Sequence, residues 1–279
     1  MKYAVTLPGK IGDILWALPT VREIARESGE KVRLIIPAMW KGVAPLLKAQ
    51  DYVGEVTELD GKEWPIRMEA PIQPWYPPGI FHRPGEMVIN LGHSGWPSAP
   101  LPFQYWLNLA ERWPGLVKKT KPDMSPWIQP HRMGMRMDFP QIYYGMSEQW
   151  IELKAGVLVA LAESLYALIR VPGLPGGRHM EFEFESRNGE VFFSEAGWID
   201  SARIMSLCHL YVGCCSSQWV LACAMGVPVV LFDPDPGRHN EIFWWDGEGK
   251  NEKVIGSDGQ PTWDARAVVQ AVREKLHQR

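Results

Sequence analysis

The chain has 279 residues, a formal net charge of −3 and a hydrophobic content of 46%. This length fits one large or two modest domains, and the apolar content is sufficient for a sizeable core. The acidic balance argues against a dominant nucleic-acid role, because phosphate binding usually brings a basic surplus. The 14 tryptophans favour a carbohydrate or nucleotide ligand, since indole rings stack on sugars and bases.

The N-terminal stretch predicts the opening of a Rossmann-like domain. Tyr3–Leu7 is a short apolar run typical of a strand, and the glycine-containing loop Pro8–Asp13 follows it. Ile14–Glu27 has apolar residues at helical spacing, with Pro19 predicted to kink the helix or mark a break in it. Lys31–Pro37 is the second predicted strand, so strand and helix alternate as in a parallel α/β sheet.

Further elements of the same kind follow. Val43–Gln50 is predicted to be a helix, and Gly54–Leu59 indicates a third strand. Residues 61–83 are rich in Pro, Trp and Tyr without a clear period, which predicts a long surface excursion. Met87–Leu91 returns as a strand and Phe103–Trp113 as a helix.

The proline-containing stretch Pro114–Met146 shows no periodicity and is the best candidate for a domain boundary. After it, Ile151–Ile169 fits either one helix or a strand followed by a short helix. Val171–Gly177 is predicted to be a loop. Asn188-Gly189 separates the alternating run Met180–Glu185 from Val191–Ser194, which predicts a β-hairpin.

The most informative stretch is Gly213–Pro236, which follows a predicted helix, Asp200–Cys208, and a predicted strand, Leu207–Val212. Ser216 and Ser217 precede a helix-like run, Trp219–Met225. Gly226 is predicted to end it in the left-handed conformation, and Val227–Phe232 follows as a strand. A helix N-terminus beside two hydroxyls is a suitable place for a diphosphate. The alternative is that the serines are only helix caps.

The cysteines lie close together, at positions 208, 214, 215 and 223, but without the spacing of a zinc site. Buried thiols in a reducing compartment are the expected interpretation, and no metal site is predicted. The N-terminus lacks the pattern of a signal peptide, and Val157–Ile169 is too short to span a bilayer. A cytoplasmic location is therefore expected.

Three segments resemble the ADP-heptose:lipopolysaccharide heptosyltransferase family, glycosyltransferase family 9. KIGDILWALPTVREIAR (10–26) is similar to its first loop and helix, and MVINLGHSGWPSA (87–99) to its acceptor-facing strand and loop. SARIMSLCHLYVGCCSSQWVLACAMGVPVVLFDPDPGRHN (201–240) resembles its C-terminal signature. The three segments cover about half of the chain and occur in the family's order.

The resemblance implies an α/β chain of the GT-B fold, with two Rossmann-like domains whose parallel sheets face each other across a cleft. We expect an acceptor domain over residues 1–135 and a nucleotide-sugar donor domain over residues 136–279. The implied activity is an inverting, metal-independent glycosyl transfer. The sugar would move from a nucleoside-diphosphate-sugar to an acceptor hydroxyl, such as that of a carbohydrate, without any other cofactor.

Asp13 matches the catalytic aspartate of the family, which implies that it is the base for the acceptor hydroxyl. The alternative is that Asp13 only caps the following helix. The chain also departs from the family, because Cys215 and Val220 stand where an aspartate and a histidine are usual. The family's basic loop is not recognisable, and Arg170, Arg178 and His179 are replacements by location only.

Other candidates follow from their positions at strand ends and helix starts. The residues expected to contact the donor are Ser216, Ser217, Gln218, Glu195, Asp200, Asp233, Arg238 and His239. Those expected to contact the acceptor or a phosphate are Lys10, Gly12, His93 and Ser94.

Two other functions remain open. One is a DNA- or nucleotide-modifying glycosyltransferase of the kind that viruses carry, favoured only by the basic run Lys118–Lys121 and the MGMRM segment (133–137). The other is a non-catalytic nucleotide-sugar-binding relative that keeps the fold without the usual aspartate and histidine. The absence of a GxGxxG motif after the first strand argues against an oxidoreductase.

Overall fold

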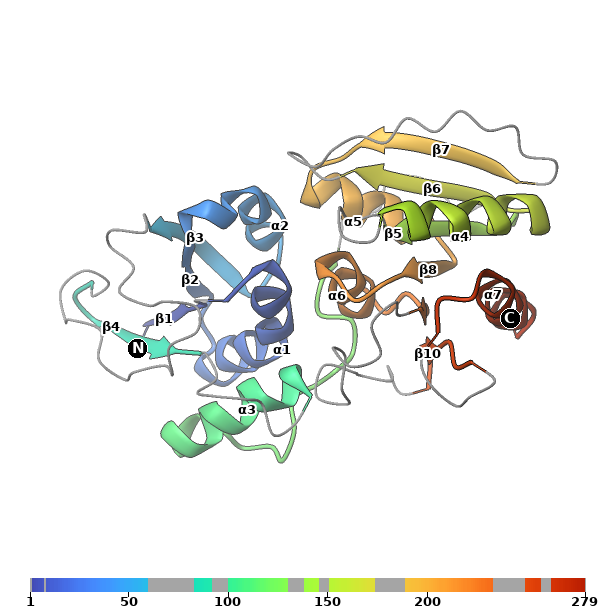
Figure 1. The fold of residues 1–279 in the computed structure, drawn as a ribbon. Helices are drawn as coiled ribbons and strands as arrows, with labels where there is room; N and C mark the ends of the chain where they lie inside the picture. The colour runs from blue at the N-terminus through green and yellow to red at the C-terminus, as the bar shows by residue number, and fades with distance from the viewer. Residues whose placement is uncertain are drawn as a thin grey trace. The chain divides into compact units, whose positions relative to one another are not determined.

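A computed structural model describes residues 2–7, 9–59, 83–91, 100–129, 138–145, 151–173, 189–232, 249–256 and 262–278. The chain divides into two compact units, Met1–Gln129 and Pro130–Arg279. Each unit is built on one parallel sheet (Figure 1). The division predicted from the sequence lies a few residues later, after residue 135. The two units are described below as the N-terminal and C-terminal domains.

The N-terminal domain has a four-stranded sheet in the order β3-β2-β1-β4, with every neighbouring pair parallel. The strands β1 to β4 are Lys2–Thr6, Val32–Pro37, Val53–Leu59 and Glu86–Asn90. The helices are α1 (Ile11–Ser28), α2 (Ala44–Lys48) and α3 (Leu101–Arg112), with 3₁₀ turns η1 (Ala38–Val43) and η2 (Pro114–Leu116). These elements confirm the predicted strand and helix order.

Helix α1 runs through Pro19 without a break and ends at Gly29, whose φ of 70° is left-handed. Because proline has no N–H, the carbonyl of Leu15 four residues earlier lacks its usual partner in the helix. The indole N–H of Trp127 donates to this carbonyl over 3.0 Å. The predicted break is therefore wrong, since a side chain from another segment replaces the missing hydrogen bond.

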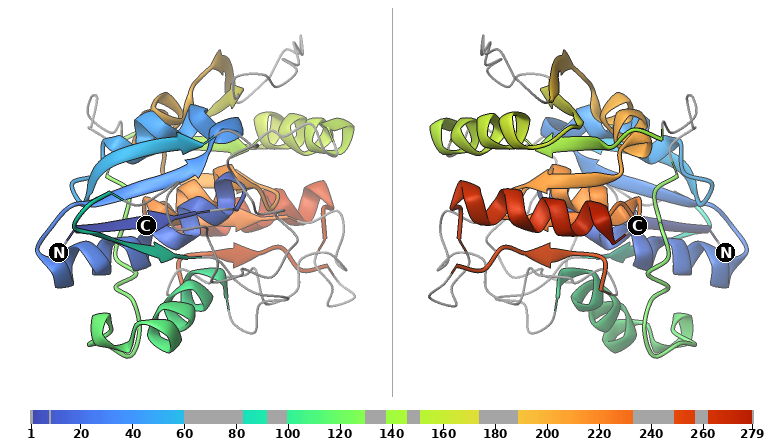
Figure 2. Two further views of the ribbon diagram at one scale, coloured as in Figure 1. Left: turned by 90° about the vertical axis from the view of Figure 1, so that its left-hand side faces the viewer. Right: turned by 90° about the vertical axis from the view of Figure 1, so that its right-hand side faces the viewer.

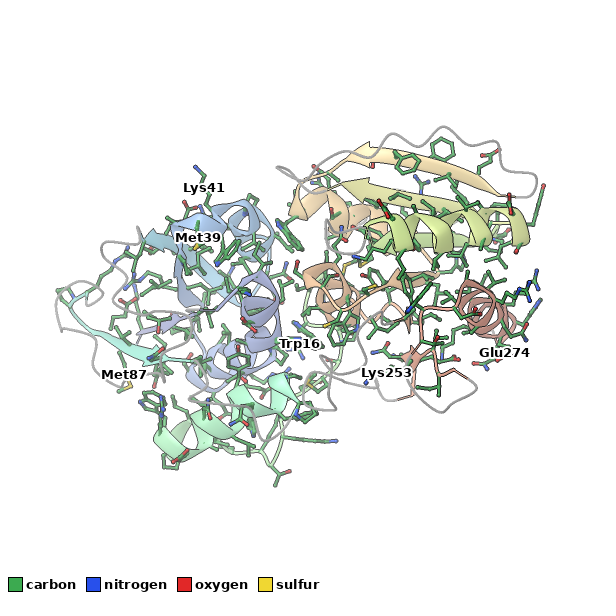
Figure 3. The ribbon with its side chains drawn as sticks, in the orientation of Figure 1. Trp16, Met39, Lys41, Met87, Lys253 and Glu274 are labelled. Atoms are coloured by element: carbon green, nitrogen blue, oxygen red, sulfur yellow. The ribbon has the colours of Figure 1, made fainter. Side chains whose placement is uncertain are left out.

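Trp127 belongs to the irregular segment 117–129, which is bound closely to the N-terminal domain. Its buried ring packs against Trp16 of α1 with the ring centroids 5.9 Å apart; Trp16 is labelled in Figure 3. The hydroxyl of Tyr52 donates to the Trp127 carbonyl over 2.6 Å, and the Gln129 N–H donates to the Gln50 side chain over 3.0 Å. Segment 117–129 is thus part of the N-terminal core, although it has no repeating pattern.

Charged side chains hold the same segment along α1. Arg22 donates to the carbonyls of Asp123, Ser125 and Pro126, and Arg26 pairs with the Asp123 carboxylate. A hydrogen bond from the Ser125 backbone is the largest cause that lowers the pKa of Asp123, from 3.8 to about 2. Asp123 therefore remains ionised in the folded protein at pH values where a free aspartic acid is protonated.

We expect Asp123→Asn to destabilise the protein at pH 7 by about 1 kcal/mol, because solvent screening limits a partly exposed network. Since the folded pKa is depressed, this stabilisation is present above pH 4 and is lost as the pH falls towards 2. Urea midpoints of the two proteins between pH 7 and pH 3 measure the effect. A difference in midpoint that stays constant over this range would contradict it.

Two lysines of the basic run also face α1. Lys118 pairs with Glu27, and Lys119 pairs with the buried carboxylate of Glu23 over 2.9 Å. These two cations are therefore engaged by acidic side chains of the same domain. The MGMRM segment, the other feature that favours nucleic acid, lies outside the described residues.

The C-terminal domain has a six-stranded sheet in the order β10-β9-β8-β5-β6-β7, again with parallel neighbours. The strands β5 to β10 are Gln141–Gly145, Leu168–Gly173, Glu190–Glu195, Leu210–Gly213, Val229–Leu231 and Glu252–Lys253. The helices α4 to α7 are Ile151–Ser164, Trp198–Leu207, Ser217–Ala224 and Ala265–His277.

Helices cover both faces of this sheet. Figure 1 shows α5 and α6 on one face and α4 and α7 on the other, and Figure 2 shows α4 and α7 side by side. The main apolar core lies beneath α4 and α7 and includes Ile142, Tyr144, Val212 and Phe232. The strands are buried from both sides, which explains their continuous apolar runs.

Four predictions for this half need correction or fall outside the described residues. Gln141–Gly145, placed in the irregular stretch, is the strand β5. The region Ile151–Ile169 holds helix α4 and the start of β6, and β6 continues through Val171–Gly173, which was predicted to be a loop. The first arm of the predicted hairpin, Met180–Glu185, lies outside the described residues.

Candidate functional site

The strand orders locate one edge position in each domain where ligands commonly bind. In the N-terminal sheet, β2 and β3 extend to one side of β1 and β4 lies on the other side. In the C-terminal sheet, β6 and β7 extend to one side of β5, while β8 to β10 extend to the other. Ligands of such sheets bind outside the carboxyl ends of the strands where the order reverses. These positions are β1/β4 and β5/β8.

Asp13 lies close to the carboxyl end of β1, within the first turn of α1. Asp13 was predicted to lie in a loop, but α1 begins at Ile11, so Asp13 is the third helical residue. Its Oδ2 accepts a hydrogen bond from the Lys10 backbone N–H over 2.9 Å. Asp13 therefore does cap the helix. One carboxylate oxygen carries this contact, and the same contact fixes the direction of the side chain.

Gly9 approaches the Asp13 side chain closely, and Tyr105 lies near enough to feel its charge. A Cβ atom at Gly9 would overlap the Cβ of Asp13 and lie 2.8 Å from its Oδ2. Tyr105 is a buried residue of α3, and burial raises the pKa of its phenol, with the charge of Asp13 acting in the same direction. The carboxylate thus has a neutral phenol near it and little space for its own side chain to move.

The rest of this edge is polar. The buried hydroxyl of Thr6 at the end of β1 donates to Oδ1 of Asn90 at the end of β4 over 2.8 Å. Lys10 is exposed just before α1, and Gly12 is in its first turn. After β2, Met39 is 69% exposed and Lys41 is also exposed; both are labelled in Figure 3. Sequence reasoning missed Thr6, Asn90, Met39 and Lys41.

The loop between β8 and α6 forms the corresponding edge of the C-terminal domain. Ser216 is the N-cap of α6, and its Oγ accepts a hydrogen bond from the Trp219 backbone N–H over 3.3 Å. Ser217 is the first helical residue and is half-buried. The helix ends as predicted, because Gly226 has a φ of 68°. Ser216 is thus a cap that also lies at the carboxyl edge.

Tyr211 supports this loop from within the sheet. Its hydroxyl lies 3.2 Å from the Oγ of Ser216 and donates to the Cys214 carbonyl over 3.4 Å. A Cβ at Gly145 would overlap this hydroxyl, and one at Gly213 would lie 2.6 Å from it. The two central strands therefore end in glycine because the phenol occupies the space of their side chains.

A buried amine lies on the opposite face of the same edge. Lys154 of α4 is only 1% exposed, and the hydroxyl of Tyr144 donates to its backbone carbonyl over 2.7 Å. Burial lowers the pKa of its ammonium group, while the nearby Cys214 acts in the opposite direction. Lys154 was not predicted as a site residue, because the sequence left open whether Ile151–Ile169 forms one helix or a strand followed by a short helix.

The other predicted donor contacts differ in position. Gln218 is buried, and its amide donates to the Tyr143 hydroxyl and the Pro172 carbonyl over 3.3 Å, so its contacts lie inside the domain. Asp200 is half exposed in the first turn of α5, whose N-cap is Gly197, and it pairs with Arg203 over 2.9 Å. The helix predicted to start at Asp200 therefore begins earlier, at Trp198.

The remaining candidates lie away from the two edges or outside the described residues. Glu195 ends β7, at the outer edge of the sheet. His93, Ser94, Asp233, Arg238 and His239 lie outside the described residues, as do Arg178 and His179. Arg170 of β6 donates to the Gln141 side chain over 2.9 Å.

Cys208, Cys214 and Cys223 are buried, and Cys215 is half-buried. Among the described residues, no three His, Cys, Asp or Glu side chains gather as a metal site. In the same part of the chain, no helix has the length and hydropathy needed to cross a bilayer.

No family model and no curated protein matches the sequence, whereas solved structures match its fold over the whole length. A glycosyl transferase family 9 protein from Veillonella parvula has a TM-score of 0.63 and 11% identity, covering 100% of this chain and 97% of its own. The E. coli heptosyltransferase WaaC with ADP-2-deoxy-2-fluoro heptose gives 0.63 and 12%, covering 98% and 99%.

The E. coli ADP-heptose lps heptosyltransferase II gives a TM-score of 0.65 at 14% identity, covering 100% of this chain and 99% of its own. Likeness at such low identity concerns the path of the chain and not the residues of a site. It confirms the expected fold class: the chain has the GT-B fold, with two Rossmann-like domains on parallel sheets.

Proposed function

We propose that this protein is an inverting glycosyltransferase, a divergent relative of glycosyltransferase family 9, that uses a nucleoside-diphosphate-sugar donor. One observation carries the proposal: each strand-order reversal bears the group that such a reaction needs. A carboxylate, Asp13, lies at the β1/β4 edge, and a helix N-terminus with Ser216 and Ser217 lies at the β5/β8 edge. These are the two edges at which ligands of parallel sheets bind.

The donor diphosphate is assigned to the N-terminus of α6. The first turn of a helix leaves backbone N–H groups without partners inside the helix and carries the positive end of the helix dipole. Ser217 adds a hydroxyl in that turn, and Ser216 adds another at the cap. These groups stabilise the negative charge that develops on the diphosphate as it leaves.

Asp13 is assigned as the general base. It accepts the proton of the acceptor hydroxyl while the oxygen attacks the anomeric carbon and the bond to the diphosphate breaks. Attack from the face opposite the leaving group inverts the anomeric configuration. The Lys10 N–H holds one carboxylate oxygen, and the close approach of Gly9 restricts the rotamer, so the side chain is oriented before the acceptor binds.

The choice of donor starts from the similar structures. The E. coli WaaC structure was determined with an ADP-heptose analogue, so ADP-sugars are the first donors to test. Cys215 and Val220 replace the acidic and imidazole groups usual in the family, which removes one negative charge near the proposed diphosphate site. We therefore include UDP- and GDP-sugars, because the base and sugar contacts of this chain need not follow the family.

A thermal-shift screen against nucleoside diphosphates and their sugars tests the proposal. A ligand at 100 times its dissociation constant stabilises the folded state by about 2.7 kcal/mol. We expect one diphosphate-sugar series to raise the melting temperature and Ser217→Ala to reduce this rise. Ser217 is chosen because Ser216 also caps α6. No rise with any nucleoside diphosphate would contradict the donor site.

A further inference from the structure

The hydroxyl of Tyr211 lies directly beneath the proposed anion site. Tyr211 is fully buried on the β8 face that α5 and α6 cover, and its ring stacks on that of Tyr143 with centroids 5.9 Å apart. Its hydroxyl reaches the sheet edge between Gly145 and Gly213. There it contacts Ser216 over 3.2 Å and the Cys214 carbonyl over 3.4 Å.

Packing alone does not explain a tyrosine at this position. A phenylalanine would fill the same ring space and would also come too close to a Cβ at either glycine, but only the tyrosine hydroxyl contacts Ser216 and the Cys214 carbonyl. Burial raises the pKa of the Tyr211 phenol, with the hydrogen bond to Ser216 acting in the opposite direction, so the phenol keeps its proton at neutral pH. Tyr211 is therefore a permanent hydrogen-bond donor at the base of the β8–α6 loop.

The direction of the Tyr211 hydroxyl proton determines whether the Ser216 hydroxyl can donate a hydrogen bond to a ligand. The Oγ of Ser216 already accepts a hydrogen bond from the Trp219 N–H. If Tyr211 donates to the Cys214 carbonyl, Ser216 can donate to the phenol oxygen and its proton points inward. If Tyr211 donates to Ser216 instead, both lone pairs of the serine oxygen are occupied, and its proton is directed away from the protein interior.

We propose that Tyr211 is a positioning residue for the donor diphosphate: its hydroxyl donates to Ser216 when the anion binds, so that Ser216 donates to a phosphate oxygen. The change is a rotation of two hydroxyl groups, with no proton transferred between oxygen atoms. This inference rests on the proposed function, because it assigns a diphosphate to the N-terminus of α6. It adds a residue that would not contact the ligand.

A double-mutant cycle tests the coupling between the two hydroxyls. Wild type, Tyr211→Phe, Ser216→Ala and the double variant are titrated calorimetrically with ADP, UDP, GDP and inorganic pyrophosphate. We expect each single variant to weaken the diphosphate that binds wild type by about tenfold, the range of one hydrogen bond to a charged group. The double variant should bind no more weakly than Ser216→Ala, because Tyr211 acts only through Ser216.

Tyr143→Phe is the matched control. Tyr143 is equally buried and lies on the same face, but its hydroxyl accepts from the Gln218 amide rather than contacting the loop. We expect its affinity to equal that of wild type, even where its melting temperature falls as much as that of Tyr211→Phe. Equal losses of diphosphate affinity in the two tyrosine variants would indicate a general loss of packing and would overturn the inference.

The outcomes separate the inference from the function on which it rests. If wild type binds none of the four probes, the proposed function fails and the inference with it. If wild type binds and Tyr211→Phe binds equally well, only the inference is overturned. It is also overturned if the losses multiply to about a hundredfold in the double variant, because the two hydroxyls then act independently.

Discussion

Asp13→Asn is expected to lower turnover by 10²- to 10⁴-fold, which is the range that a general base contributes. The amide cannot accept the acceptor proton, but its oxygen can still accept the Lys10 N–H that Asp13 binds over 2.9 Å. The helix start is therefore preserved, and affinity for the donor should remain unchanged. Release of nucleoside diphosphate from the donor chosen in the screen measures turnover, and calorimetry measures the affinity.

Asp51→Asn is the matched control for this experiment. Asp51 is an exposed carboxylate in the turn before β3, so it lies at the amino edge of the same sheet. We expect wild-type turnover from it. If Asp13→Asn turned over as fast as Asp51→Asn, Asp13 would be only a helix cap, and the non-catalytic alternative would be favoured.

Trp127→Ala is expected to destabilise the protein by about 3–5 kcal/mol, the usual cost of truncating a large buried aromatic residue. The variant loses the contact with Trp16 and the hydrogen bond to the Leu15 carbonyl that Pro19 leaves without its helical partner. Trp127→Phe should recover part of the loss, because it keeps a ring but not the N–H. The shift of the denaturant midpoint for the N-terminal domain measures both.

Trp263→Ala serves as the comparison, since that tryptophan is 50% exposed. Its effect should stay below about 1 kcal/mol, as for most surface substitutions. Equal shifts for the variants at Trp127 and Trp263 would show that segment 117–129 contributes little to the N-terminal core.

Much of the fold could be predicted from local pattern. The run Tyr3–Leu7 and the stretch from Leu207 to Phe232 combine apolar strands, small polar loops and a glycine in the left-handed conformation. Each of these signals acts over a few residues and depends on backbone chemistry alone. The parallel arrangement then follows from the alternation of strand and helix.

The failures have physical causes that a local pattern does not contain. Strand β5 is short and lies among prolines and aromatic residues, so no period marks it. The continuity of α1 through Pro19 depends on Trp127, which is 108 residues away in sequence. A hydrogen bond at such separation cannot be inferred from either segment alone.

For the candidate site, residues at the carboxyl edges of the two sheets could be predicted from the sequence, but the buried residues behind them could not. Asp13, Ser216 and Ser217 follow predicted strands and lie at carboxyl edges. Gln218 was expected to face a ligand, but helical rotation points its amide towards Tyr143 and Pro172. Tyr211 could not be identified, because a tyrosine within an apolar strand resembles any core residue until Gly145 and Ser216 are brought to it.

The initial anomer released from the donor tests the central claim most directly. Water can serve as the smallest hydroxyl acceptor, so proton NMR can follow consumption of the selected nucleoside-diphosphate-sugar without knowledge of the natural acceptor. We predict that the first free sugar to appear has the anomeric configuration opposite to that of the donor, and that Asp13→Asn suppresses its release. Retention of configuration, or equal release by Asp13→Asn, would contradict an inverting glycosyltransferase with Asp13 as its base.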